Sequence, residues 1–173
     1  LYYELRKAVE DLSREQRAEV WASIDLAVNL LAAVTALFAT GRLTTRFGMP
    51  TTLGIVPVIM AIGWATVTLN PTMLTIIIVQ VIRRAGNYAI TRPGREMLFT
   101  LVDDETRFKS KPVIDTVVYR GGDVATAWFY TTIVKVFGLG MAGVAGVGAV
   151  FALIWAAVGI TLGRRFERKA KTE

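Results

Sequence analysis

Five apolar stretches of roughly membrane-spanning length alternate with short charged segments, and this alternation most constrains the fold. They lie at residues 20–40, 50–69, 72–91, 124–139 and 143–162, and the fourth has a helical lead-in from about residue 111. A hydrocarbon core about 30 Å thick takes roughly 20 helical residues to cross. Since 53% of the 173 residues are apolar, we predict an all-α integral membrane bundle with about five transmembrane helices.

Basic residues gather in alternate connections, which orients the predicted helices. Arg42 and Arg46, the segment 92–111 and the segment 164–171 fall on one side, whereas the connections 70–71 and 138–142 are uncharged. Positively charged connections stay on the cytoplasmic side, so we expect a cytoplasmic C-terminus. Residues 1–19 are then an extracytoplasmic connector with the end of a preceding helix. Residues 20–173 are a C-terminal transmembrane half-bundle with a cytoplasmic loop at 92–112.

Composition excludes most enzyme classes. The chain has no Cys and no His, so thiolate nucleophiles, imidazole bases and Cys/His zinc sites are ruled out. Paired carboxylates at metal spacing, a nucleophile–base set and a glycine-rich phosphate loop are also missing, and we expect no enzyme, cofactor or metal. The net charge of +6 is explained by topology and anionic lipid, so no nucleic-acid partner is expected.

Polar side chains are concentrated in the third apolar stretch. Gln80, Arg83, Arg84 and Asn87 follow i, i+3, i+4, i+7 spacing, which places them on one helical face. At about 1.5 Å per residue, Arg83 lies near mid-depth. Arginines at that depth are too costly to face lipid, so at least one should line an aqueous cavity or pair with a carboxylate. The alternative is a short helix whose arginines snorkel to the interface.

Other polar residues extend this list of candidates. Asp25 and Asn29 are four residues apart on one face of the first stretch. One interpretation of Asp25 is a buried carboxylate that caps Asn29 or a neighbouring helix. Arg120 and Asp123 are one turn apart and can pair, while the glycines between them admit a backbone or a ligand. The acidic run 103–105 is a candidate cation site, although adjacent carboxylates diverge and a solvated turn is favoured.

Local signals predict several details of the fold. We expect a loop at 41–48, a kink near Pro57 and a tight turn at Asn70-Pro71. After residue 91 we expect a helix on the membrane surface and then a turn at residues 109–112. Small residues at four-residue spacing in the last stretch, such as Gly159 and Gly163, predict close helix packing.

Residues 95–111, with Ile114-Asp115 and residues 119–123, resemble the ATP:ADP antiporter (NTP/NDP exchange transporter) family, as do residues 24–29, 40–43 and 83–89. The segment 41–48 is similar to a cytoplasmic loop of the major facilitator superfamily. The resemblance implies a bacterial inner-membrane protein with a twelve-helix fold, in which Leu1–Tyr3 ends helix 7 and the five stretches are helices 8 to 12. Its implied partners are the N-terminal half of the same transporter, the lipid bilayer and a small-molecule substrate, a nucleotide.

The resemblance also implies a basic residue at Arg84, an acidic one at Asp25 and a basic one near Arg120. We therefore expect nucleotide exchange by alternating access. Two alternatives stay open: a transporter of another anionic solute with the arginines as a salt-bridge latch, and a membrane sensor or scaffold that transports nothing. The expected substrate-binding residues are Arg83, Arg84, Asn87, Arg120, Asp25, Asn29, Gln80 and Tyr88, and the expected gating or ion-pair residues are Asp25, Asp123, Arg42 and Arg46.

Overall fold

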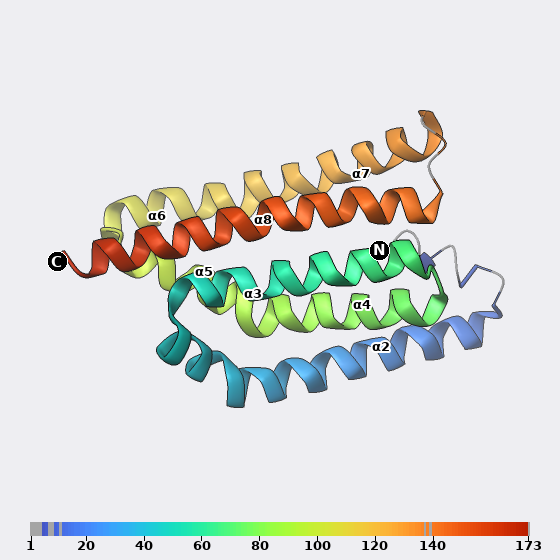
Figure 1. The fold of residues 1–173 in the computed structure, drawn as a ribbon, viewed down its shortest axis with the longest axis horizontal. Coiled ribbons are helices and arrows are strands. Elements are labelled where there is room, and N and C mark those ends of the chain that lie inside the picture. Colours follow the sequence, from blue (N-terminus) through green and yellow to red (C-terminus); the bar gives the residue numbers. More distant parts are fainter. Residues whose placement is uncertain (1–4, 7–8, 11, 137, 139, 173) are drawn as a thin grey trace.

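Long helices lie side by side in the computed structural model, which describes residues 5–6, 9–10, 12–136, 138 and 140–172 (Figure 1). No strand occurs in this part of the chain, so the predicted all-α class is confirmed. The expected end of a preceding helix at Leu1–Tyr3 lies outside the described residues.

The helices follow one another with few breaks, because π-helical turns join several of them. Helix α2 continues through η1 into α3, α4 continues through η2 into α5 and the 3-10 turn η3, and α6 continues through η4 into α7. The bounds are α2 Arg14–Thr35, η1 Ala36–Thr40, α3 Gly41–Leu69, α4 Met73–Gly86, η2 Asn87–Thr91, α5 Arg92–Leu98, η3 Phe99–Leu101, α6 Asp104–Val113, η4 Ile114–Val118, α7 Tyr119–Val136 and α8 Met141–Ala170.

Side-chain caps stabilise the N-termini of α2 and α4. The Ser13 hydroxyl accepts the Gln16 N–H at 3.2 Å, and the Gln16 side chain accepts the Ser13 N–H at 3.0 Å. This capping box satisfies two amides that the helix leaves without partners. The Thr72 hydroxyl caps α4 by accepting the Thr75 N–H at 3.3 Å, directly after the turn predicted at residues 70–71.

Four helical runs in the described chain are long and apolar enough to cross a membrane: Arg14–Phe38, Gly41–Leu69, Met73–Leu101 and Met141–Ala170. They contain four of the five predicted stretches. The stretch at 124–139 is not among them, although α7 is helical as predicted. Its 18 residues carry Arg120, Asp123 and Lys135, and these charges lower its hydropathy. Residues 137 and 139 of the fifth predicted stretch lie outside the described residues, so the described part of the chain has four membrane-length helices and the fifth stays a prediction.

Three local predictions need correction. Residues 41–47 are helical and not a loop, and the backbone breaks only at Gly48 (φ 79°, ψ 175°) within α3. The expected surface helix after residue 91 is instead a continuation of the third span as far as Leu101. The expected turn at 109–112 is helical, and the chain turns at Val102-Asp103. In each case a residue that usually ends a helix lies within a longer helical segment.

Helices α3 and α8 form the most extensive helix pair, and glycines make it close. A Cβ built on Gly159 would lie 2.8 Å from the Leu53 carbonyl oxygen, and one on Gly163 would lie 2.5 Å from the Pro50 Cα. Pro57 has no N–H to offer the Leu53 carbonyl, which leaves this oxygen free to face Gly159. The predicted packing role of Gly159 and Gly163 is confirmed.

The two ends of the bundle differ in charge. The uncharged turn at residues 70–72 lies at one end, whereas the C-terminal residues of α8 and the α5–α6 turn lie at the other (Figure 1). The basic segments 92–111 and 164–171 therefore gather at a single end. This placement agrees with the charge alternation from which the membrane orientation was predicted.

Candidate functional site

An ion pair joins the polar faces of α2 and α4. The Arg84 Nη1 donates to Asp25 Oδ1 at 2.5 Å, although 59 positions separate the two residues. The side chains keep 28% and 54% of their accessible surface, so the pair lies on an open side of this chain. The two residues were predicted from different stretches, and the packing of α2 against α4 brings them together.

Arg83, the neighbouring arginine, has a different environment. Its Nε donates to Gln80 Oε1 at 3.2 Å, and Gln80 is only 2% exposed. No carboxylate of the described residues forms an ion pair with Arg83. A buried amide therefore orients this guanidinium group without neutralising its charge.

Both arginines lie near the middle of the run from Met73 to Leu101. Arg83 is ten residues beyond Met73, which is about 15 Å at the rise of an α-helix. A span that began at Met73 would have both arginines near its middle, because a hydrocarbon core is about 30 Å thick. Both arginines belong to a helical run of 29 residues, which is longer than the roughly 20 residues that cross a bilayer.

The remaining predicted residues of these helices lie close by. Asn29 is exposed one turn beyond Asp25, and Asn87 is half-buried at the start of η2. Tyr88 is 42% exposed, and the Arg92 guanidinium lies over its ring at 4.7 Å. The sequence analysis did not select Arg92, although its i, i+4 spacing from Tyr88 is a readable signal for such a cation–π contact.

A hydroxyl group bridges the two π-helical turns beside this site. Pro93 lacks an N–H, so the Ala89 carbonyl four residues earlier loses its α-helical donor. The Thr40 hydroxyl of η1 donates to this carbonyl at 2.7 Å, and Thr40 is 7% exposed. A π-helical turn often marks a functional position in a helix. Here the Thr40 hydroxyl links the π-helical turn that follows α2 to the one that follows α4.

The structure does not bring the other predicted residues to this site. Arg120 and Asp123 are exposed on α7, and neither forms an ion pair with any described residue. Helix α7 lies beside α8, whereas α2 lies on the opposite side of the bundle (Figure 1). Arg42 and Arg46 are exposed near the start of α3, where Arg46 lies 6.0 Å from the centre of the Phe47 ring.

A charged cluster links α5 to α6 and η4 at the basic end. Lys111 Nζ lies 2.6 Å from Glu96 Oε2, and Arg95 Nη2 lies 3.2 Å from Asp115 Oδ1. The sequence analysis missed these contacts because 15 and 20 positions separate the partners. Each ion pair satisfies its own charges, so the cluster is a structural link between segments.

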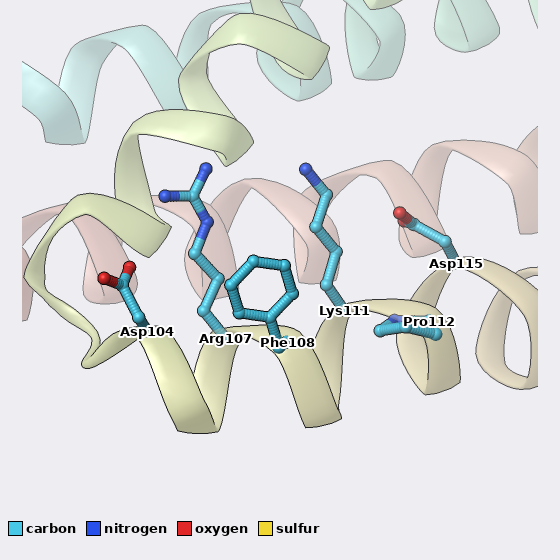
Figure 2. A pocket seen from close by; sticks show the side chains of 6 residues that line it. All are labelled: Asp104, Arg107, Phe108, Lys111, Pro112 and Asp115. Carbon is cyan, nitrogen blue, oxygen red and sulfur yellow. The ribbon is translucent and has the colours of Figure 1, made fainter.

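A shallow hollow of about 490 Å³ lies beside this cluster. Figure 2 shows the Arg107 and Lys111 side chains extending in one direction from the same helix, with Asp104 and Asp115 at the two ends. Acidic and basic groups are balanced along it, so the hollow does not favour an ion of either sign. Its lining residues are Asp104, Arg107, Phe108, Lys111, Pro112 and Asp115.

The acidic run before α6 serves the helix that follows it. The Asp103 Oδ2 accepts the Thr106 N–H at 2.8 Å, and this hydrogen bond holds the pKa of Asp103 below its usual range. Glu105 pairs with Lys109 one turn away. Among the described residues, no group of three acidic side chains is placed to hold a metal ion.

Comparison with protein families, with curated proteins and with solved structures found no match to this chain. The fold defines the class of the protein: an all-helical chain with four helices long and apolar enough to span a membrane. Two arginines and a carboxylate lie midway along its spans.

Proposed function

We propose that this chain is the C-terminal half of a secondary transporter with a major-facilitator-like bundle. It would exchange anionic solutes of the ATP and ADP type across a bacterial inner membrane by alternating access. The observation that carries the proposal is the arginine pair at mid-span, in which Arg84 has a carboxylate partner and Arg83 has none among the described residues.

The energetics of this pair favour an aqueous cavity. A guanidinium at the centre of a bilayer costs about 2.5–3.5 kcal/mol on insertion scales. Asp25 neutralises one of the two groups but is itself 54% exposed. An open face with three charged groups at this depth is compatible with water or with protein and is incompatible with lipid tails. The N-terminal half of a transporter would close the other side of such a cavity.

The two arginines would have different roles in binding. Arg83, oriented by Gln80, offers guanidinium donors to a phosphate group, and such charge-assisted contacts are strong away from bulk water. Arg84 is held by Asp25 while the site is empty. An entering polyanion would compete with Asp25 for Arg84, and the pair would form again when the anion leaves. Binding would thereby be coupled to a change in the contact between α2 and α4.

Counterflow of labelled ATP against ADP in proteoliposomes carrying the whole transporter tests the proposal. We expect Arg83→Gln to weaken nucleotide affinity roughly 10- to 100-fold, because a hydrogen bond to a charged group contributes about 1.5–3 kcal/mol. Arg14→Gln is the matched control, since Arg14 is an exposed arginine at the start of a helical run and lies outside the predicted site. Equal exchange by Arg83→Gln and the control would contradict the assignment, and no exchange by the folded native protein would exclude nucleotides.

The Asp25–Arg84 ion pair favours one second candidate, a transporter of another anionic solute in which this pair is a latch between α2 and α4. A latch predicts that Asp25→Asn and Arg84→Gln each impair transport and that the double variant recovers much of the loss. A direct role of Arg84 in substrate binding predicts no recovery. Uptake of a panel of organic and inorganic anions by all three variants distinguishes the two.

A further inference from the structure

The last turns of α8 present three arginines to the outside. Arg164, Arg165 and Arg168 are all exposed, and none forms an ion pair with any residue that the structure describes. Positions i, i+1 and i+4 lie on one side of a helix. Gly163, on the other side, is buried against Pro50 of α3. The arginines therefore form an outward-facing basic cluster.

The one nearby carboxylate is used elsewhere. Glu167 is the only acidic residue between positions 124 and 172. Its Oε1 accepts the Met49 N–H at 2.9 Å, across 118 positions of sequence. Because the backbone breaks at Gly48, Met49 starts a new helical section, and Gly48 has no side chain with which to cap it. Glu167 supplies this cap from α8, which leaves the three arginines without a counter-charge from their own helix.

An apolar strip continues from the basic cluster along the same helix. Trp155, Val158 and Leu162 are 39%, 52% and 44% exposed. With Arg165 they follow i, i+3, i+7, i+10 spacing, which places them in one line along α8. Trp155 lies ten residues, or about 15 Å, from Arg165, which equals half the thickness of a hydrocarbon core. The strip and the cluster together match one leaflet in length.

We infer that this face of α8 binds an anionic phospholipid, with the headgroup phosphate on Arg164, Arg165 and Arg168 and the acyl chains along the apolar strip. Guanidinium groups bind phosphate oxygens in a bidentate geometry. A basic residue near an anionic leaflet strengthens binding about fivefold, so three together give roughly 100-fold. The site is on α8, whereas the ion pair joins α2 and α4 on the opposite side of the bundle, and the site does not depend on the proposed transport function.

Fluorescence quenching by brominated lipids tests this inference on the protein reconstituted in phosphatidylcholine bilayers. Brominated phosphatidylglycerol should quench tryptophan emission at a lower mole fraction than brominated phosphatidylcholine does. The difference should disappear in Trp155→Phe, because Trp155 reports on the strip. The binding preference for phosphatidylglycerol over phosphatidylcholine should fall roughly 100-fold in the triple variant Arg164→Gln, Arg165→Gln, Arg168→Gln. Equal quenching of the native protein by the two lipids would overturn the inference.

Two controls separate this site from general charge attraction and from misfolding. Arg14→Gln with Arg17→Gln removes exposed arginines of α2 and should leave the preference unchanged. Replacing the three α8 arginines with Lys keeps the charge, so it should retain part of the preference. A preference that survives the Gln variant, or is retained in full by the Lys variant, counts against phosphate recognition by guanidinium groups. Displacement of the lipid by millimolar inorganic phosphate would assign the arginines to a soluble anion instead.

Discussion

Substitution of Gly163 by Ala should loosen the contact between α3 and α8. A Cβ at this position would lie 2.5 Å from both Pro50 Cα and Pro50 N, and 2.7 Å from the Met49 carbonyl carbon. All three are backbone atoms, so no side-chain rotation relieves the overlap. Ordinary contact begins near 3.4 Å, and the two helices must therefore separate by about 1 Å. A gap of that size forfeits a quarter to a half of each dispersion contact along the shared surface.

The expected cost of this change is about 1–3 kcal/mol, as for other overpacked interfaces. For a chain of this size it corresponds to a fall of about 2–12 °C in the midpoint of thermal unfolding. The assay is loss of helical circular dichroism on heating in detergent micelles. Gly146→Ala on the same helix is the matched control, because no atom lies within 4 Å of its built Cβ. The better helix propensity of Ala should leave that variant as stable or more stable.

A Gly163→Ala protein that unfolds at the same temperature as the native protein would refute this reasoning. It would mean that α3 and α8 separate without loss of contact elsewhere. A fall of the same size in Gly146→Ala would refute it as well, because the cost would then come from the residue type and not from the interface.

Two further predictions concern hydrogen bonds made by single side chains. Thr40→Val should destabilise the protein by about 1–3 kcal/mol in chemical unfolding, because the buried Ala89 carbonyl loses its donor; Thr45→Val, whose hydroxyl bonds its own helix, should cost less. Asp103 has a lowered pKa in the folded state, so its cap on α6 is present above the unfolded pKa of about 4 and is lost as pH falls through the folded pKa. The protection factor of the Thr106 amide, its exchange rate relative to an unstructured peptide at the same pH, should therefore fall in acid, and Asp103→Asn should remove this pH dependence.

The candidate site shows how far local reasoning reaches. The spacing of Gln80, Arg83 and Arg84 is sufficient to place them on one face of a helix, because helical periodicity depends on the chain alone. Their place midway along the apolar run also follows from counting residues. That Arg84 pairs with Asp25 while Arg83 bonds to Gln80 depends on how α2 approaches α4. No local rule supplies that approach.

The places where prediction failed have a common physical cause. Gly48, Pro93 and Pro112 are residues that usually end or bend helices. Here π-helical turns follow or precede the two prolines, and Glu167 caps the break at Gly48. Partners from other helices and changes of helical register compensate for the lost hydrogen bonds, so the segments continue. A glycine or proline in the sequence indicates that local helical hydrogen bonds are lost. It does not indicate whether a partner from another helix compensates for them.

The sequence by itself determined the helical class, the membrane-length runs and the gathering of basic residues at one end, because hydropathy, periodicity and charge are properties of the chain read in order. Tertiary structure alone decided that α5 extends α4 and that Glu167 accepts the Met49 N–H. It also decided that Arg84 has a carboxylate partner whereas Arg83 has none among the described residues. These features join residues up to 118 positions apart. They depend on which helix faces pack, and the energy of that packing is shared among many weak contacts that no single segment contains.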